Sequence, residues 1–487
     1  MGRILAINDG DRLKMKNIEK VAYFSYSPYR LAWEQIRVIS PLRALGIDLI
    51  EGVNQCQVNL EVIEDADLVV LDRNFPGGFN QSLKVIEVAH EQRKPVIMDM
   101  DDDLLGLEFD HPDLVNTTFG FELVPTLFAL RAVDAVTVTT PLLQSVIAQH
   151  NDHVYVLPNY LDDTIWSMKS RERAEHNFPV TLMYFGTRSH QADLEMISEP
   201  LKALAQKYSD KLTFIFYGIE APKGLEAFAE VRYFLTVTHE YREFAKQIQE
   251  FYADIAFAPL QDIVFNHSKS PLKYFEYTAL GLPSLYSNIP PYKVVVEDGK
   301  TGFLASSSEE WFDKLTQLVE SPVLRETILQ QAQEDVKQNH LLSRHTDEWR
   351  KVYNEVLERG IVSKSDRAIN LDLLNRISHH VGTAANYQAH QISMYAQKNE
   401  VLSIDIYALN SALQDSEKTR KTLDTEIDAL KVALHDSEET SKSLGTEIEA
   451  LKVALHSSEL EVVDYATSTS WKITRPIRRV IRKLRRR

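Results

Sequence analysis

The chain has 487 residues, with 70 Asp and Glu against 54 Lys and Arg, giving a net charge of −16. This length exceeds what one hydrophobic core usually serves, so it predicts two or more domains. The single cysteine, Cys56, excludes an internal disulfide framework and a cysteine-rich metal site, and it favours a reducing compartment. The acidic balance argues against general affinity for nucleic acid, so we expect no nucleic-acid partner.

Residues 1–20 form a predicted N-terminal extension. Charged residues are scattered through it, and it lacks the sustained apolar core that a signal peptide requires. Nowhere does the chain contain about 18 consecutive uncharged apolar residues, the length of a membrane-spanning helix. We therefore expect a cytoplasmic protein.

Residues 21–165 alternate between short apolar runs and helical patterns. The apolar runs are VAYFSY, DLVVLD, PVIMDM and DAVTVT, and the helical patterns cover residues 33–45, 82–93 and 141–149. Strands separated by helices of this length pair in parallel through crossover connections. This part of the chain is therefore predicted to be a doubly wound, Rossmann-like domain.

Residues 166–359 repeat the alternation and predict a second Rossmann-like domain. Its apolar runs are VTLMYFG, KLTFIFYG, DIAFAPL and SLYSN, and its helical patterns cover residues 192–208, 241–251 and 271–280. The predicted fold class is therefore α/β, with two doubly wound domains in tandem. Such a pair encloses a deep cleft between the carboxyl ends of the two sheets, where ligands of open α/β sheets bind.

A predicted helical linker, residues 360–400, leads to a predicted coiled coil over residues 401–466. Within it LDTEIDALKVALHDSE recurs as LGTEIEALKVALHSSE, displaced by three heptads, so the repeat keeps its register. We expect this segment to form a homodimer or a hetero-assembly, and a solvated single helix is the alternative. The predicted d positions are Leu402, Leu409, Leu423, Leu430, Leu444 and Leu451, and the a positions are Ile406, Leu413, Ile427, Leu434, Ile448, Leu455 and Val462.

The terminal segment SWKITRPIRRVIRKLRRR, residues 470–487, holds nine Lys or Arg and no acidic residue. Its Ile, Val and Leu residues fall on one helical face, and Trp471 stands at its start. This composition is typical of an amphipathic helix that lies in a membrane interface with anionic headgroups. We expect peripheral association with the inner face of the cell membrane, and a solvated tail or an RNA contact is the alternative.

The segment KSPLKYFEYTALGLPSLYSN, residues 269–288, carries most of the functional inference. It opens a predicted helix at the mouth of the cleft, and a helix start exposes unpaired backbone N–H groups that suit a diphosphate. Lys269 and Lys273 add positive charge one turn apart. The carboxylate of Glu276 can accept hydrogen bonds from both vicinal hydroxyls of a ribose.

This segment resembles the donor-binding motif of the retaining GT-B glycosyltransferases of group 1, or family 4. The similarity rests on Glu276 followed by Gly281 and Pro283, continues through VVEDGKTGFL and Trp311, and extends loosely over residues 21–359. It implies a hexosyltransferase that uses a nucleotide-diphosphate sugar, with an N-terminal acceptor domain and a C-terminal donor domain. It also implies no cofactor and no metal, because such enzymes neutralise the leaving diphosphate with cations and helix dipoles.

Two departures from the family pattern concern the donor site. The family often has a glutamate eight positions before Glu276, where this chain has Ser268. The loop FGTRSHQAD offers Gly186, Arg188 and His190 but lacks the lysine that the family usually places there. We infer that Lys269 compensates for that lysine. A plain turn at Gly186 and a surface role for Arg188 are the alternatives.

Four aspartates, Asp99, Asp101, Asp102 and Asp103, lie at the carboxyl end of a predicted strand and face the cleft. They could bind a divalent metal, bond to or deprotonate an acceptor hydroxyl, or cap the following helix. The loop SYSPYR places Tyr29 and Arg30, with Arg37 beyond it, where an acceptor could bind, although a solvated loop is equally compatible with its composition.

The sequence as a whole predicts a retaining glycosyltransferase that extends a glycan or lipid-linked acceptor in bacterial surface polysaccharide synthesis, of the O-antigen or capsule type. The predicted catalytic residues are Asp101, Asp102, Arg188 and Lys269. The predicted donor-binding residues are Gly186, Arg188, His190, Lys269, Lys273 and Glu276, and the acceptor side comprises Tyr29, Arg30 and Asp101. A catalytically silent coiled-coil scaffold and a GT-B sugar-nucleotide epimerase are the alternatives.

Overall fold

The computed structural model describes residues 17–27, 30–75, 79–107, 119–169, 179–235, 238, 240–362, 442 and 446. The chain divides into two compact units, and the first holds two six-stranded sheets. The second unit comprises residues 77–80, 108–125 and 368–487, of which the structure describes the first turns of two helices and residues 442 and 446. Apart from residues 360–362, 442 and 446, the predicted linker, coiled coil and basic tail therefore lie outside the described residues.

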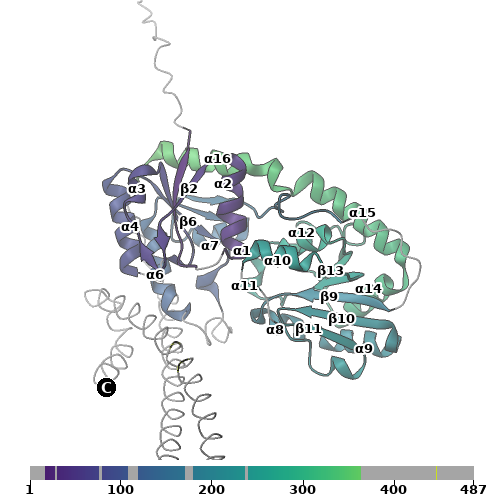
Figure 1. The fold of residues 1–487 in the computed structure, drawn as a ribbon. Coiled ribbons are helices and arrows are strands. Elements are labelled where there is room, and N and C mark those ends of the chain that lie inside the picture. Colours follow the sequence, from purple (N-terminus) through teal and green to yellow (C-terminus); the bar gives the residue numbers. More distant parts are fainter. Residues whose placement is uncertain are drawn as a thin grey trace, which may run out of the picture. The chain divides into compact units, whose positions relative to one another are not determined.

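The N-terminal sheet has the strand order β2-β1-β5-β6-β7-β8, and every neighbouring pair is parallel (Figure 1). Its central strands read as continuous apolar runs because helices cover both faces of a parallel sheet. The order in which the strands are added to the sheet changes direction between β1 and β5, so the switch point of the sheet lies between these two strands. The strands are β1 (Lys20–Phe24), β2 (Asp48–Glu51), β5 (Leu68–Leu71), β6 (Val96–Met100), β7 (Ala135–Val138) and β8 (Val154–Val156).

The helices of this part begin with α1 (Ala32–Glu34), which continues through a π-helical turn, η1 (Gln35–Ile39), into α2 (Ser40–Leu45). Gly46 ends α2 with φ 68°, a left-handed conformation that glycine adopts without strain. A small antiparallel hairpin pairs β3 (Val53–Asn54) with β4 (Gln57–Val58). The remaining helices are α3 (Val62–Asp65), α4 (Phe79–Glu91), η3 (Leu104–Gly106), α6 (Phe119–Ala132) and α7 (Pro141–Ile147).

The C-terminal sheet has the strand order β11-β10-β9-β12-β13-β14 and is also parallel throughout. This is the strand order of dinucleotide-binding Rossmann domains, whose ligand crevice lies where the chain order reverses, here between β9 and β12. The strands are β9 (Val180–Phe185), β10 (Leu212–Tyr217), β11 (Glu230–Phe234), β12 (Ile255–Ala258), β13 (Ser284–Ser287) and β14 (Phe303–Ala305). The two sheets match the predicted α/β class.

The helices around this sheet cluster at its carboxyl edge and on its two faces. Those at or near the carboxyl edge are η4 (Arg188–His190), α8 (Gln191–Glu195), α10 (Tyr241–Ile248), α11 (Val264–His267), α12 (Leu272–Ala279) and α13 (Pro290–Lys293). The others are α9 (Ser198–Tyr208), η5 (Ser209–Lys211), η6 (Leu225–Ala227), α14 (Ser308–Glu320) and α15 (Pro322–Asn339).

The last described helix, α16 (Leu342–Arg359), packs on the N-terminal sheet, as Figure 1 shows. Trp349, Tyr353 and Val356 share a core cluster with residues of β1 and α2, and Trp349 Nε1 donates to the carbonyl of Arg37 at 2.9 Å. Sequence order had placed residues 342–359 in the second domain. An amphipathic helix can bury its apolar face against either sheet, so its pattern does not identify the partner.

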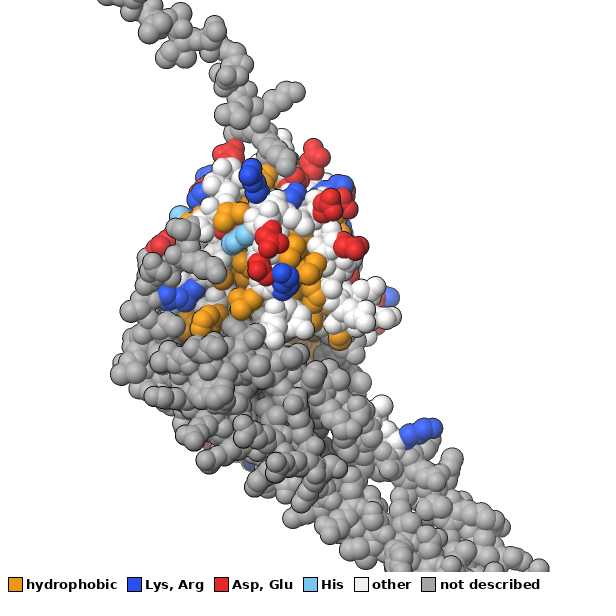
Figure 2. Space-filling view, turned by 90° about the vertical axis from the view of Figure 1, so that its left-hand side faces the viewer, with side chains coloured by type: hydrophobic (Ala, Val, Ile, Leu, Met, Phe, Trp, Pro, Cys, Tyr) orange, Lys and Arg blue, Asp and Glu red, His pale blue; other side chains and the backbone are white. Residues whose placement is uncertain are grey.

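The surface on the side of the N-terminal sheet that carries α3 and α4 shows acidic, basic and apolar side chains interspersed (Figure 2). Within the described part of the chain, no helix is long and apolar enough to cross a membrane. The same residues contain no group of three or more His, Cys, Asp or Glu side chains arranged to hold a metal ion.

Candidate active site

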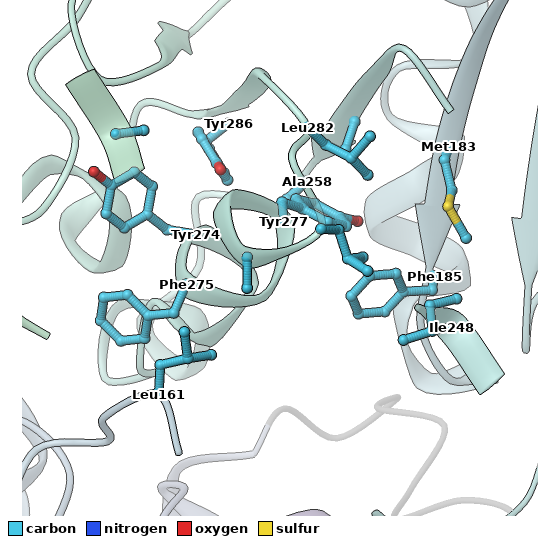
Figure 3. Close-up of a cluster of buried hydrophobic side chains, with 14 of the residues drawn as sticks. Leu161, Met183, Phe185, Ile248, Ala258, Tyr274, Phe275, Tyr277, Leu282 and Tyr286 are labelled. Carbon is cyan, nitrogen blue, oxygen red and sulfur yellow. The ribbon is translucent and has the colours of Figure 1, made fainter. Parts of the chain in front are cut away.

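Helix α12 lies within a cluster of buried hydrophobic side chains (Figure 3). Tyr274, Phe275 and Tyr277 are buried there among side chains of β9, α10 and β13. Tyr277 Oη donates to the carbonyl of Phe257 at 3.1 Å, and Tyr274 Oη donates to Asp335 at 2.8 Å. These contacts fix the direction of α12, so its first turn lies at the carboxyl edge of the sheet.

Glu276, on α12, is a buried carboxyl group with 3% of its surface exposed. Tyr241 Oη donates to its Oε1 at 2.7 Å and accepts a hydrogen bond from Trp166 Nε1 at 3.0 Å. Burial raises the pKa of Glu276 to about 7, although Lys273 and the tyrosine hydroxyl oppose this shift. The carboxyl group is therefore poised between its two protonation states near neutral pH.

Two lysines lie close to each other at this end of α12, and Lys273 is the one whose charge acts on Glu276. Lys273 Nζ lies 5.2 Å from the ring centroid of Phe185, and burial lowers the pKa of this lysine. Lys269 Nζ lies 4.4 Å from the ring centroid of Phe265 and 3.4 Å from Asp102 Oδ1. A bound anion would offset the cost of holding both cations in this partly desolvated place.

The loop after β9 carries the other predicted donor-binding residues. Gly186 is the first residue after the strand, and Arg188 is exposed, with a side chain that makes no hydrogen bond or ion pair with any other described residue. His190 Nδ1 lies 2.8 Å from Asp193 Oδ2. Burial lowers the pKa of His190, and the two nearby lysines lower it further. His190 therefore lies close enough to Lys269 and Lys273 for their charges to act on it.

Asp193, on α8, links the loop after β9 to the loop after β12 and was not singled out by the sequence. Its Oδ2 contacts His190, and its Oδ1 accepts hydrogen bonds from the backbone N–H of Gln261 at 2.7 Å and from Asn266 Nδ2 at 3.2 Å. The spacing of His190 and Asp193 at i and i+3 was the available signal. Ser268, in contrast, is buried, and its hydroxyl donates to the carbonyl of Phe265 at 2.9 Å.

Asp101 and Asp102, at the carboxyl end of β6, are bound by an arginine that the sequence also did not single out. Arg73 Nη1 lies 2.6 Å from Asp101 Oδ1 and 3.4 Å from Asp102 Oδ2, and its guanidinium stacks 4.1 Å from the ring centroid of Trp33. Burial raises the pKa of Asp101 despite Arg73. Burial also acts on Asp102, but Lys269 and Arg73 hold its pKa below the ordinary value.

The other aspartates of this edge have structural contacts. Asp99 forms a bidentate ion pair with Arg37, with Nε to Oδ1 at 3.0 Å and Nη2 to Oδ2 at 2.9 Å. Asp103 caps η3 by accepting from the backbone N–H of Gly106 at 2.9 Å. Arg37 is 1% exposed. It therefore does not reach the surface where an acceptor could bind, contrary to its expected position.

Of the other acceptor-side residues, Tyr29 lies outside the described residues. Arg30 pairs with Glu51 of β2. Its carbonyl accepts a hydrogen bond from the backbone N–H of Tyr241 at 2.8 Å. The side chain of Arg30 thus has a surface partner, while its backbone contacts the C-terminal sheet's helix α10.

Residues 268–270, just before α12, contact the carboxyl edge of the N-terminal sheet at three points. Lys269 pairs with Asp102, Thr140 Oγ1 donates to the carbonyl of Ser268 at 2.8 Å, and Asn159 Nδ2 donates to Ser270 Oγ at 2.8 Å. The structure thus brings Lys269, a predicted donor-binding residue, beside Asp102, one of the two aspartates predicted to be catalytic. The arrangement can hold a polyanion next to carboxylates able to accept hydrogen bonds from hydroxyl groups.

Comparison with known proteins agrees with this geometry. Residues 179–321 match the family model of the glycosyl transferases, group 1. The fold resembles that of HepE from Anabaena in complex with UDP and glucose, at 14% identity and a TM-score of 0.51, over 69% of this chain and 100% of HepE. HepE in complex with UDP gives 13% identity, a TM-score of 0.50 and the same coverage.

The crystal structure of TarM is also similar, with 15% identity and a TM-score of 0.45, and covers 61% of this chain. This chain spans only 59% of TarM. No curated protein matches the chain. The family match covers less than half of this chain, and the likeness to HepE, at 14% identity, is a likeness of fold.

Proposed function

We propose that this chain is a retaining glycosyltransferase that moves a hexosyl group from a nucleotide-diphosphate sugar to a glycan or lipid-linked acceptor. The observation that carries the proposal is the buried Glu276 one turn beyond Lys273, with Arg188 and Lys269 at the same carboxyl edge. In this assignment Glu276 binds the ribose, and the cations bind the diphosphate. HepE forms complexes with UDP and glucose and with UDP-glucose. These ligands of HepE support a nucleotide sugar as the donor of this chain.

In the proposed reaction the bond between the anomeric carbon and the donor diphosphate breaks, and a bond to the acceptor oxygen forms on the same face of the sugar. The acceptor proton passes to the leaving diphosphate. Negative charge grows on that group, so Arg188, Lys269, Lys273 and the first turn of α12 lower the barrier by stabilising it. Asp101 or Asp102 accepts a hydrogen bond from the acceptor hydroxyl and orients it.

A screen of nucleotide sugars tests this function directly. Incubation with UDP-, GDP-, ADP- and dTDP-sugars is expected to release nucleoside diphosphate from one nucleotide class, measured by a coupled assay. Binding should also raise the melting temperature, and the rise should grow with the logarithm of the ligand concentration above Kd. A scaffold would release nothing, and an epimerase would change the sugar without steady release, so either outcome would replace the proposal.

The acceptor is proposed to be a growing bacterial surface glycan on a lipid carrier. This assignment rests on the basic segment 470–487, which would hold the enzyme at the inner face of the membrane. The predicted coiled coil would then set dimerisation, or recruit a second assembly enzyme. Apart from residues 442 and 446, both segments lie outside the described residues, so their sequences alone support this part of the proposal.

Deletion of residues 470–487 is expected to move the protein from the membrane fraction to the supernatant. Nine basic residues contribute roughly 1 kcal/mol each near an anionic surface, so their loss should remove most of the attraction. Co-sedimentation with vesicles containing anionic lipid measures the effect, with neutral vesicles as the control. Equal sedimentation of the full-length and shortened proteins would contradict membrane attachment.

A further inference from the structure

Tyr184, in β9, has a hydroxyl group that finds no partner among the described residues. The side chain is fully buried, at 0% exposure, and no described residue forms a hydrogen bond with its Oη. Buried polar groups are nearly always hydrogen-bonded, because an unpaired one loses its bonds to water without replacement. The groups around this hydroxyl indicate what could bind to it.

The hydroxyl lies among the predicted donor-binding residues. A Cβ atom at Gly186 would approach Tyr184 Oη to 2.7 Å, so the hydroxyl occupies the space that a side chain at Gly186 would fill. Lys273 Nζ lies 5.6 Å from the centroid of the Tyr184 ring. Burial and the charge of Asp193 raise the pKa of Tyr184, so its hydroxyl keeps its proton and can act as a donor.

We propose that Tyr184 is a donor-binding residue whose hydroxyl donates a hydrogen bond to an oxygen of the donor's diphosphate. This inference rests on the proposed function. In the free protein the Gly186 backbone lies over the hydroxyl, and the contact forms as residues 186–190 adjust around the bound diphosphate. The absence of a side chain at Gly186 gives the phosphate oxygens access to the hydroxyl.

A diphosphate is the partner that the local charges favour. Lys273 lies over the Tyr184 ring, and Lys269 and Arg188 lie on the neighbouring segments, so an anion is drawn to this place. Ser268, which stands where related enzymes often have a glutamate, donates its hydroxyl to the carbonyl of Phe265 instead. Tyr184 thus supplies a further polar group in a donor site where Ser268 offers none.

Tyr353, on α16, provides a matched control. Its side chain is also at 0% exposure, and its hydroxyl is likewise unpaired among the described residues. It lies in the core cluster of the N-terminal sheet with Val21 and Trp349. Replacing either tyrosine with phenylalanine removes the same unpaired atom, so the two variants differ in their position relative to the donor site.

The test measures binding of UDP, GDP and ADP, and of the matching nucleosides, to the full-length protein and to Tyr184→Phe and Tyr353→Phe. For the nucleotide that the unaltered protein binds, Tyr184→Phe is expected to weaken diphosphate affinity about tenfold and to leave nucleoside affinity unchanged. Tyr353→Phe should leave both affinities unchanged. Neither variant should lower the melting temperature, because each removes a buried group without a partner.

Equal diphosphate affinity in Tyr184→Phe and the unaltered protein would overturn the assignment of Tyr184. So would an equal loss of diphosphate and nucleoside affinity, or loss of the cooperative melting transition, since either would mean that the hydroxyl supports the fold. If the unaltered protein binds none of the nucleoside diphosphates, the proposed function fails first, and the assignment of Tyr184 falls with it.

Discussion

Replacing Glu276 with alanine is expected to lower kcat/KM for the nucleotide sugar by about a hundredfold or more. Two hydrogen bonds from ribose hydroxyls to a carboxylate are worth roughly 3 kcal/mol or more together, and this loss falls directly on the transition-state free energy. The change also leaves the buried hydroxyl of Tyr241 without its acceptor, so some stability should be lost. Steady-state kinetics and thermal melting separate the two effects.

Asp335→Ala is the control for this prediction. Asp335 accepts a hydrogen bond from Tyr274, a neighbour of Glu276 on α12, in the same way that Glu276 accepts one from Tyr241. Its replacement should therefore reproduce the loss of a tyrosine–carboxylate contact and leave kcat/KM unchanged. If the two variants lost stability and activity to the same extent, Glu276 would be a structural residue and not a ribose ligand.

Replacing Arg37 with methionine is expected to reduce the free energy of unfolding by about 3–5 kcal/mol. Arg37 and Asp99 are 1% and 6% exposed, so the change leaves a buried carboxylate with only Thr137 Oγ1, at 2.6 Å, as a side-chain partner. Arg37 also donates to the carbonyl of Leu157, and that bond is lost as well. Denaturant unfolding monitored by circular dichroism measures the difference.

Arg30→Met is the matched control, because Arg30 forms a more exposed ion pair with Glu51. Exposed pairs of this kind contribute about 0–1 kcal/mol. Adding Asp99→Asn to Arg37→Met should recover part of the stability, since it removes the unpaired charge. If the two single variants lost equal stability and Arg37→Met raised the KM for the acceptor, Arg37 would be an acceptor-binding residue and not a structural one.

The sheets were predictable because their strands are short apolar runs bounded by polar turns. VIMDM and LTFIFY became β6 and β10, every residue of which is buried. The regular alternation with helices then implied parallel pairing, since crossover connections leave few other arrangements. The motif around Glu276 predicted a helix between β12 and β13, and α12 occupies that place.

The partners of individual charged residues were not predictable, because they are far apart in the sequence. Arg37 and Asp99 are 62 residues apart, and Arg73 and Asp101 are 28 apart. A sequence pattern reports which face of an element is apolar, but a single arginine gives no periodic signal. Asp193 was missed for the same reason, since its contacts with Gln261 and Asn266 arise only when two loops meet at the sheet edge.

The packing of α16 on the N-terminal sheet bears on how the chain folds during synthesis. Trp349 and Arg37, joined in that core, are 312 residues apart. At roughly 5–20 residues per second, a ribosome needs about 15–60 s to add that stretch. During this interval the apolar surface around Val38 and Leu42 has no α16 to cover it, even after the last strand, β14, has been made. The first sheet to be translated is thus the last to complete its core, so premature termination before residue 342 should yield a chain that chaperones retain.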